Sequence, residues 1–376
     1  MIAATAHIDL DALRANFALA RERAGGREVI AVVKAEAYGH GAVPVARVLR
    51  AEGAAQLAVW SVDEAMALRD QGDRGPLLVL RGACSAEEAS LAVAHGLTPV
   101  LHDRGDLGRV AEAARSAGVA HPVHVEVDTG MRRMGVPPAE AAAFLAGLVA
   151  TPGLRLEGTF SHLARADEVD LAPTREQLAA FGGVLATAAE CGVDPGRVHV
   201  ANSAGLARLP EWEDEAPTQH AVRPGLWLYG AQPVPSRPLP LRPVMSLHAP
   251  VVAVRAVRRG EAVGYAARYR APRDTRVATL ALGYADGVPI ASTGRGEVWL
   301  AGGRRPMAGR ISMDYVGVEV GDAPVSVGDR AVVFGSETPG GPTLLPVDEA
   351  AAAAGTIPYE LLVHPRTRVA HVLHGA

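Results

Sequence analysis

The sequence predicts a parallel α/β barrel followed by a smaller, mainly β domain. From about Val29 to Gly225, short β-branched apolar runs alternate with Ala- and Leu-rich segments of helical period, which is the pattern of a parallel α/β fold. This part contains eight strand candidates, the number that closes a (β/α)8 TIM-like barrel. A proline-rich passage, Gln232–Pro243, ends the alternation, and period-2 strands with glycine turns follow it.

The barrel elements are short and follow one another in a regular order. The strand candidates are Val29–Val33, Gln56–Trp60, Leu77–Leu80, Thr98–Leu101, Val123–Val127, Leu156–Ser161, Val198–Ala201 and Ala221–Arg223. The helical segments are Val43–Ala51, Val62–Asp70, Glu87–Ala94, Asp106–Ser116, Pro138–Val149 and Arg175–Glu190. The helix between the last two strands has the weakest pattern. We expect the barrel to span residues 8–232.

The proline-rich passage is typical of a linker that is stiffened by restricted φ angles. Strands are predicted beyond it at Ala249–Val257, Arg276–Leu282, Glu297–Ala301, Tyr315–Val320 and Arg330–Phe334, with one helix near Val347–Ala354. We therefore expect a C-terminal β domain over residues 233–376, joined by an N-terminal strand within residues 1–7.

Composition narrows the function. The chain of 376 residues has a formal charge of −4 and no basic run, so neither nucleic acid nor an anionic membrane is expected as a partner. No apolar stretch reaches the roughly 18 residues of a spanning helix, and the start lacks the pattern of a signal peptide. A cytoplasmic enzyme is expected. Cys84 and Cys191 have neither metal-ligand nor disulfide spacing, so we expect no metal site and two buried free thiols.

The basic residues are 36 arginines and a single lysine, Lys34. Where only positive charge is needed this chain uses arginine, so the exception indicates a task that a guanidinium cannot perform. A lysine amine can lose its proton in a desolvated pocket and form a Schiff base with a carbonyl group. The count alone leaves an accidental surface lysine equally open.

Position favours a functional lysine. Polar residues follow the predicted strands at their carboxyl ends, where the loops of a β/α barrel converge on the active site. Lys34 closes the first strand, the segment 128–133 (DTGMRR) follows the fifth, His162 ends the sixth, Asn202 and Ser203 end the seventh, and Arg223 ends the eighth.

Motifs along nearly the whole chain resemble those of alanine racemase, in the family's order. They are IDLDALRAN (8–16), AVVKAEAYGHG (31–41), EVDTGMRRMG (126–135), SHLARADE (161–168), HVANSAG (199–205), VRPGLWLYG (222–230), VGYAARY (263–269), LGYADG (282–287), GRISMD (309–314) and TIPYELL (356–362). The resemblance implies a fold-type III pyridoxal 5′-phosphate (PLP) enzyme that interconverts L- and D-alanine. It also implies a head-to-tail homodimer whose active sites are shared between subunits. Whether the product would serve cell-wall synthesis or a specialised pathway stays open.

The resemblance implies two bases, because one residue cannot take a proton from one face of a carbon and return it on the other. Lys34 would carry PLP and act on one face, and Tyr265 of the partner subunit would act on the other. A free phenol has a pKa near 10, so Tyr265 needs nearby positive charge, which His162 and Arg223 could supply through a hydrogen-bond chain. The alternative for Tyr265 is a core aromatic residue.

The resemblance places Arg223 at the pyridine nitrogen of PLP. Arginine can only donate hydrogen bonds, so the ring nitrogen would stay neutral and the cofactor would withdraw electrons less strongly, which limits transamination. A salt bridge at the barrel rim is the alternative.

The phosphate of PLP would lie at the loops after the seventh and eighth strands. Tyr38 and Tyr359 resemble the family's phosphate-binding phenols, and Ser203 with the amides of Gly225 and Leu226 stands in the expected loops. Asn202 is also expected at the cofactor. Ser203 alone could equally be a helix N-cap.

The substrate carboxylate would be bound by the guanidinium of Arg133, which also contacts the phenolic oxygen of PLP. The backbone N–H of Met313 would be a second contact, and Tyr284 would line the entrance. Both residues would come from the partner subunit.

Two positions depart from the family pattern. Glu126 stands where many members carry a carbamylated lysine. Its charge could hold Arg133 without carbon dioxide, with its shorter reach compensated by a shift or by water. Glu36 replaces an asparagine two residues from Lys34, on the same face if the strand continues. Glu36 could face outward, pair with an arginine, or alter the pH dependence.

Three other functions remain possible. A racemase of another small amino acid, such as serine, would differ only near Tyr359 and Tyr284. A fold-type III decarboxylase of basic amino acids fits the motifs less well. A non-catalytic PLP carrier would lack the β domain and Tyr265.

Overall fold

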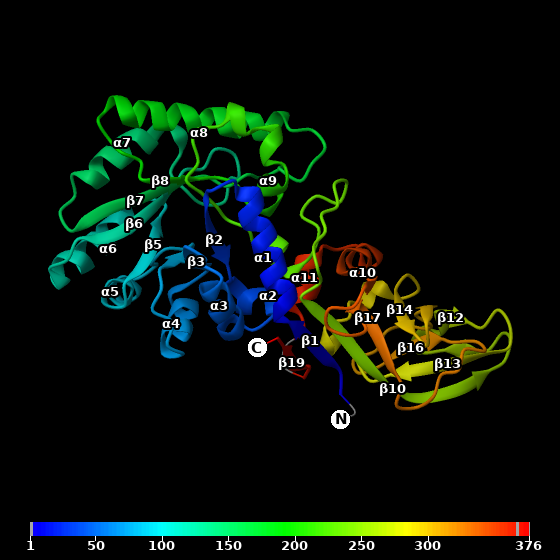
Figure 1. Ribbon diagram of the computed structural model, residues 1–376. Helices are drawn as coiled ribbons and strands as arrows, with labels where there is room; N and C mark the ends of the chain where they lie inside the picture. Colours follow the sequence, from blue (N-terminus) through cyan, green and yellow to red (C-terminus); the bar gives the residue numbers. More distant parts are fainter. Residues whose placement is uncertain (1–2, 366–367, 376) are drawn as a thin grey trace.

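A computed structural model describes residues 3–365 and 368–375. A β/α barrel and a mainly β domain lie side by side, with helix α1 (Leu10–Ala24) running between them (Figure 1). The predicted fold class is confirmed.

The barrel strands are all parallel to their neighbours. They are β2 (Glu28–Val32), β3 (Gln56–Val59), β4 (Leu77–Val79), β5 (Leu97–Leu101), β6 (His121–Glu126), β7 (Leu154–Phe160), β8 (Arg197–His199) and β9 (Ala221–Val222). The order β8-β7-β6-β5-β4-β3-β2-β9 makes an eight-stranded sheet of described residues. Backbone bonds from His220 N–H to Val198 O (2.8 Å) and from Arg223 N–H to Ala201 O (2.7 Å) link its two ends. Each predicted strand is present, with bounds shifted by a few residues.

Helices cover the outside of the barrel (Figure 1). They are α3 (Ala42–Ala51), α4 (Val62–Asp70), α5 (Ala86–Ala94), α6 (Arg104–Ala117), α7 (Pro138–Val149) and α8 (Ala172–Glu190). The weakly patterned eighth-strand connection contains only α9 (Ser203–Ala207) and the 3-10 turns η1 (Leu209–Glu211) and η2 (Glu213–Glu215) within the described chain.

The N-caps of α4, α5 and α6 share one design. Ser61, Ser85 and Asp103 accept a hydrogen bond from the backbone N–H three residues on, at Glu64, Glu88 and Asp106. An N-cap of this kind satisfies a donor that the helix itself leaves unpaired, and it fixes where each helix leaves its loop.

The β domain is built on one sheet that contains nine strands of the described chain. They are β1 (Thr5–Asp9), β10 (Met245–Val257), β13 (Thr275–Leu280), β14 (Glu297–Leu300), β15 (Gly303–Pro306), β16 (Val316–Glu319), β17 (Arg330–Ser336), β18 (Thr343–Leu345) and β19 (Ala370–His374). A small hairpin, β11 (Ala262–Val263) and β12 (Tyr269–Arg270), and helices α10 (Val347–Ala354) and α11 (Pro358–Val363) complete it.

Strand β1 belongs to this second sheet although it precedes the barrel in sequence. It pairs antiparallel with β10 and parallel with β19, and Figure 1 shows β1 and β19 beside each other. Residues 1 and 2 of the expected strand, like residue 376, lie outside the described residues. The linker of 232–243 is tied to α1, because Asn16 Oδ1 accepts from Arg242 N–H (2.9 Å) and Asn16 Nδ2 donates to Arg242 O (2.8 Å).

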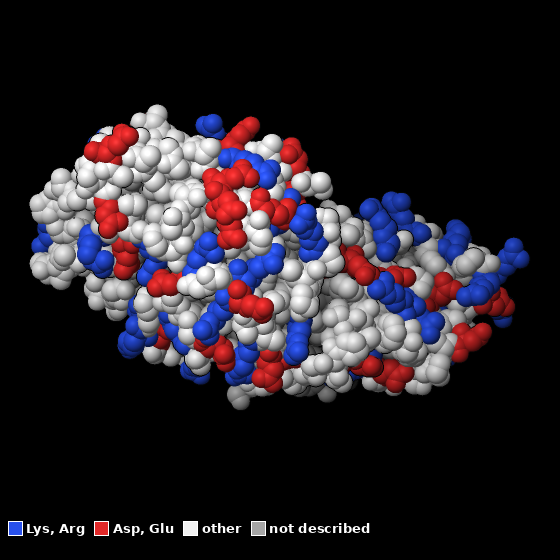
Figure 2. All heavy atoms as spheres, turned by 45° about the horizontal axis from the view of Figure 1, so that its top comes forward, with Lys and Arg blue, Asp and Glu red and all other residues white. Residues whose placement is uncertain are grey.

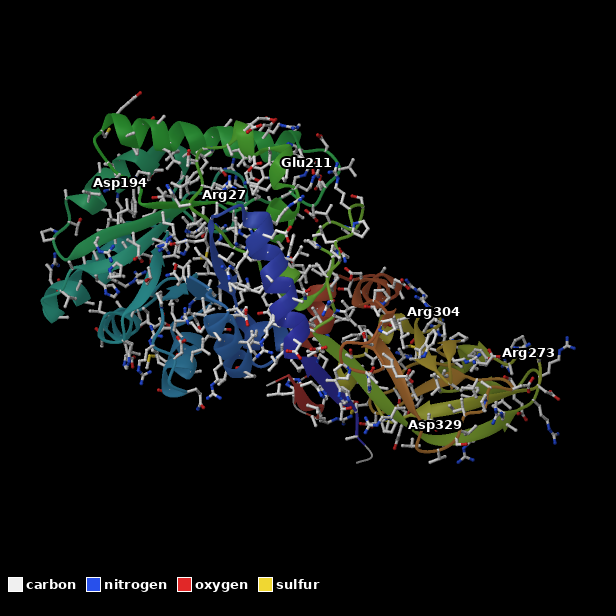
Figure 3. The ribbon with its side chains drawn as sticks, in the orientation of Figure 1. Arg27, Asp194, Glu211, Arg273, Arg304 and Asp329 are labelled. Carbon is white, nitrogen blue, oxygen red and sulfur yellow. The ribbon has the colours of Figure 1, made fainter. Side chains whose placement is uncertain are left out.

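The expectation of buried thiols is wrong, because Cys84 and Cys191 are both exposed. Each lies next to a helix end, Cys84 just before α5 and Cys191 just after α8, where side chains reach solvent. No helix among the described residues is long and apolar enough to cross a membrane. Figure 2 shows acidic and basic side chains intermixed over the face that it draws, and Arg273 and Arg304 project outward from the β domain (Figure 3).

Candidate active site

A cavity of about 590 Å³ opens at the carboxyl ends of the barrel strands. Every barrel residue predicted at the site lines it: Lys34, Tyr38, Arg133, His162, Asn202, Ser203, Arg223, Gly225 and Leu226. Tyr359 lines it too, from α11 of the β domain. The lining also includes residues that were not predicted at the site, among them Trp60, Met131, Met134, Phe160 and Ile357. Apolar side chains beside a few convergent polar groups are typical of a small-molecule site.

Lys34 does not close a strand as expected. Strand β2 ends at Val32, and Lys34 begins α2 (Lys34–Gly39). The four residues after it, 35–38, have φ of 52–55°, so they form a turn of left-handed helix. This conformation costs roughly 1–2 kcal/mol for each L-residue, and such strain persists where the surrounding structure enforces it.

The left-handed turn settles where Glu36 points. The expectation that Glu36 shares a face with Lys34 assumed a continuing strand and is wrong. The Glu36 side chain is exposed, and its Oε2 accepts from Ala42 N–H at 3.1 Å, at the start of α3. Of the three possibilities, the outward-facing one holds.

The surroundings of Lys34, above all its burial, favour the neutral amine. Burial lowers the pKa of Lys34, and Arg133 lowers it further, whereas Glu64 and Glu126 act in the opposite direction. The Nζ atom lies 5.8 Å from the centre of the Trp60 ring. A lowered pKa makes a lysine amine more available as a nucleophile or base.

Arg223 ends a hydrogen-bonded chain inside the barrel. Its Nη1 lies 2.6 Å from His199 Nδ1, and His199 Nε2 lies 3.0 Å from His124 Nδ1. Because Arg223 can only donate, His199 Nδ1 accepts and the proton of His199 sits on Nε2, which donates to His124. The Nε2–H of His124 then faces Glu157 Oε2 at 3.8 Å.

The two histidines of this hydrogen-bonded chain, His124 and His199, are uncharged. Burial, followed by the charge of Arg197, lowers the pKa of His124 to about 3, and burial lowers that of His199 well below its usual value. Burial also lowers the pKa of Arg223, to about 10, so Arg223 is protonated at neutral pH. Histidines at strand positions that face the barrel interior were the available signal for this chain, and the sequence reasoning missed it.

His162 cannot supply positive charge, contrary to expectation. Burial first, and then Arg223 and Arg133, lower the pKa of His162 to about 3. Its Nδ1 lies 3.5 Å from Arg223 Nη2, so the neutral ring accepts from the guanidinium. Positive charge in this part of the cavity comes from arginine.

The far end of the cavity is shaped by Ser203, Gly225 and Tyr38. Ser203 Oγ accepts from the N–H groups of Gly225 (2.9 Å) and Trp227 (3.3 Å). The alternative of Ser203 as an N-cap is wrong, because Asn202 caps α9 by accepting from Gly205 N–H at 2.9 Å. A Cβ at Gly225 would lie 2.4 Å from Tyr38 Oη, so only glycine leaves room for this phenol.

The two phenols remain neutral donors. Burial raises the pKa of Tyr38, and it raises that of Tyr359 to about 12. Their ring centres lie 5.8 Å apart, and Tyr38 stacks on Tyr229 at 4.7 Å.

Glu126 faces His102 rather than Arg133. Glu126 Oε2 lies 3.3 Å from His102 Nδ1, with both side chains buried. Among the described residues no ion pair joins Glu126 to Arg133. His102 is a neighbour of the site that sequence reasoning missed.

Three predicted residues, Tyr265, Tyr284 and Met313, do not reach this cavity within the chain. They lie on the β domain with 69%, 44% and 51% of their surface exposed. Tyr265 follows β11 in the turn η4 (Tyr265–Ala267).

Tyr284 and Met313 are held together by backbone bonds and one arginine. Tyr284 lies in η5 (Tyr284–Asp286), where Ala285 N–H donates to Met313 O at 3.1 Å. Arg368 binds both oxygens of Asp286 at 2.9 Å and Asp314 at 2.8 Å. These contacts make one unit of the two loops.

Comparisons with known proteins agree over the whole chain. The family model "Alanine racemase, N-terminal domain" matches residues 8–233, and "Alanine racemase, C-terminal domain" matches residues 244–373. An alanine racemase of Thermobifida fusca is 41% identical over 377 residues, covering 99% of this chain and 98% of its own.

Solved structures are similar as well. The crystal structure of alanine racemase from D-cycloserine-producing Streptomyces lavendulae has a TM-score of 0.92 at 37% identity and covers 100% of this chain and 98% of its own. That of alanine racemase from Bartonella henselae, with covalently bound pyridoxal phosphate, has a TM-score of 0.87 at 29% identity and covers 99% of each chain.

Proposed function

Because the chain belongs to the alanine racemase family, we propose that it interconverts L-alanine and D-alanine with PLP held in the barrel cavity. One observation carries the proposal: the barrel residues expected at the cofactor all line a single cavity around the only lysine of the chain. We also propose that residues 8–232 form the PLP-binding unit and that residues 233–376, with 1–7, form the β domain that completes a partner's site in the cytoplasm.

The residues of the cavity fit PLP from end to end. Tyr38 and Tyr359 keep their phenolic protons, which suits donation to a phosphate, and Gly225 leaves the space beside Tyr38 open. Gly225 N–H is engaged by Ser203, whereas the N–H of Leu226 bonds to no described residue and would serve the phosphate.

The other end of the cavity suits the pyridine ring. Both terminal nitrogens of Arg223 donate to His199, Ser161 and their neighbours, and its protonation makes it a donor to a neutral ring nitrogen. His162 and Asn202 would flank the ring, and Arg133 would contact the phenolic oxygen. When bound, PLP supplies the electron withdrawal that acidifies the Cα–H bond of the amino acid.

Two residues would move the proton at Cα. Lys34, whose pKa is lowered by burial, would take or return it on one face, and Tyr265 of the partner subunit would act on the other. The exposure of the Tyr265 side chain in the single chain, 69%, supports a role completed by a second copy. His162 is neutral, so Arg223 is the positive group that would favour the phenolate of Tyr265 of the partner subunit.

The substrate carboxylate would be bound from both subunits. Arg133 offers a guanidinium fork from the barrel, and the backbone N–H of Met313 of the partner subunit would add a second donor. Glu126 would act on Arg133 through charge alone, since it contacts His102 instead. Tyr284 of the partner subunit would narrow the entrance.

A chiral assay over a panel of L-amino acids, with carbon dioxide release recorded together, tests the proposal. We expect D-alanine to form fastest and no carbon dioxide. Faster racemisation of serine would make serine the substrate in place of alanine. Carbon dioxide release from basic amino acids would make the chain a decarboxylase. Borohydride reduction and peptide mapping should place the cofactor on Lys34, the only lysine. A colourless protein indifferent to added PLP would refute the proposal.

The variant Tyr265→Phe tests the second base. We expect it to lose racemisation while the absorbance of bound cofactor is unchanged, because the phenol proton is removed and the barrel cavity is untouched. Turnover near that of wild type would contradict the assignment.

A further inference from the structure

The β/α units that contain helices α4, α5 and α6 each carry an acidic residue at the same position of the helix. In each, the third helical residue accepts from the backbone N–H of the residue before the N-cap. The pairs are Glu64 with Trp60 (2.7 Å), Glu88 with Cys84 (2.8 Å) and Asp106 with His102 (2.9 Å). One carboxylate oxygen therefore accepts the same backbone hydrogen bond in all three units.

The second oxygen distinguishes Glu64. The second oxygens of Glu88 and Asp106 bind arginines of their own units, Arg81 and Arg109. Glu64 Oε1 instead accepts from Ala35 N–H at 2.9 Å, which belongs to the preceding loop. Ala35 is the residue directly after Lys34 and the first of the left-handed turn.

Glu64 thus ties together two loops that both border the cavity. One is the strained turn of 35–38, and the other begins at Trp60, directly after β3. The Trp60 ring lies 5.8 Å from Lys34 Nζ. Glu64 is also the foremost of the two carboxylates that raise the pKa of Lys34, against burial and Arg133. Glu64 lies close enough to affect both the position and the charge of the amine.

We propose that Glu64 is a positioning residue for Lys34, which fixes the left-handed turn through Ala35 N–H and sets the charge beside the amine. The proposal rests on the proposed role of Lys34. Glutamine at position 64 keeps the size of the side chain, but it removes the charge and leaves only one oxygen for two N–H groups.

The test compares Glu64→Gln with Glu88→Gln, which makes the same change in the next unit, where the carboxylate serves Cys84 N–H and Arg81, without touching the turn. Lysine-selective ¹³C labelling of the full chain without cofactor gives a single Cε signal, because Lys34 is the only lysine. We expect Glu64→Gln to move the titration of this signal to lower pH, since a carboxylate that raises the pKa is lost. Glu88→Gln should leave it unchanged.

With PLP bound, kcat/KM for alanine should fall roughly 10- to 100-fold in Glu64→Gln, because a displacement of about 1 Å at a reacting group can cost this much. Glu88→Gln should retain kcat/KM within about twofold while losing a similar amount of thermal stability, as expected of a cap alone. Equal behaviour of the two variants in the titration, or equal kcat/KM, would overturn the proposal.

Glu64→Asp keeps the test decisive if Glu64→Gln does not fold. Aspartate retains the charge but is one methylene shorter, so it cannot span both N–H groups. We expect the Lys34 titration to stay near wild type while kcat/KM falls, and wild-type kcat/KM would overturn the proposal. If wild type neither binds PLP nor racemises alanine, the proposed function fails, whereas the titration difference between Glu64→Gln and Glu88→Gln is still measurable.

Discussion

Gly225→Ala tests whether the cavity is shaped for a phosphate held by Tyr38. The new Cβ would lie 2.4 Å from Tyr38 Oη and 3.0 Å from Tyr38 Cζ. Since φ of Gly225 is −122°, a negative value, the effect is one of contact and not of left-handed backbone. The Oη atom would have to retreat by about 1 Å to reach ordinary van der Waals distance, and the stacked ring of Tyr229 limits that movement.

Two consequences follow, each with its own magnitude. Overpacking should lower the free energy of unfolding of the cofactor-free chain by about 1–3 kcal/mol. A hydrogen bond to a charged phosphate contributes about 1.5–3 kcal/mol, so its loss should raise the Kd for PLP by roughly 10- to 150-fold.

The assays are urea unfolding and equilibrium titration of the cofactor-free chain with PLP. Gly183→Ala, where a Cβ meets nothing within 4 Å, is the control. In the Tyr38→Phe background, Gly225→Ala should cost little further PLP affinity, because the hydroxyl is already absent, and the two changes will be non-additive. PLP binding by Gly225→Ala within about twofold of wild type would refute the reasoning.

Three further predictions concern the shared site, acid and carbon dioxide. Verified heterodimers of Lys34→Ala and Tyr265→Ala chains should regain about half of wild-type activity, because one of the two sites keeps both bases; no recovery would count against shared sites. His124 and His162 have a pKa of about 3 in the folded chain, against the usual 6.5. Between these pH values each histidine binds a proton in the unfolded chain but not in the folded one. The free energy of unfolding should therefore fall as the pH is lowered from 6.5, by about 2 kcal/mol for each histidine at pH 5. Urea unfolding at pH 6.5 and pH 5 measures the difference, and equal stability would contradict the burial argument. Removing bicarbonate should leave KM and kcat for alanine unchanged, because Glu126 carries its charge without carbamylation, whereas a rise in KM would show that carbon dioxide is needed.

Much of the fold could be predicted because parallel strands buried on both faces form continuous apolar runs. The strands β2 to β9 were found in this way. The turn after Lys34 could not be, because Ala35 to Tyr38 contain no glycine and nothing in their side chains favours φ above zero. A contact from Glu64, distant in sequence, helps to hold that conformation, so local propensity was overruled by tertiary structure.

At the site, too, some features could be predicted from the sequence and others depend on tertiary structure. Residue types at strand ends predicted which side chains gather in the cavity, since the barrel brings its carboxyl ends together. The prediction that His162 supplies positive charge was wrong, because its charge depends on burial beside Arg223, which composition does not reveal. Likewise, the partner of Glu126 depends on where β5 delivers His102.

The pairing of β1 with β19 has a consequence for synthesis on the ribosome. Residues 5–9 emerge before the barrel, but the strand beside them is made of residues 370–374. The edge of β1 that pairs with β19 therefore stays unpaired while more than three hundred residues are translated. The barrel can fold during that time. Truncation within 370–374 would leave that edge uncovered for good and invite pairing between chains.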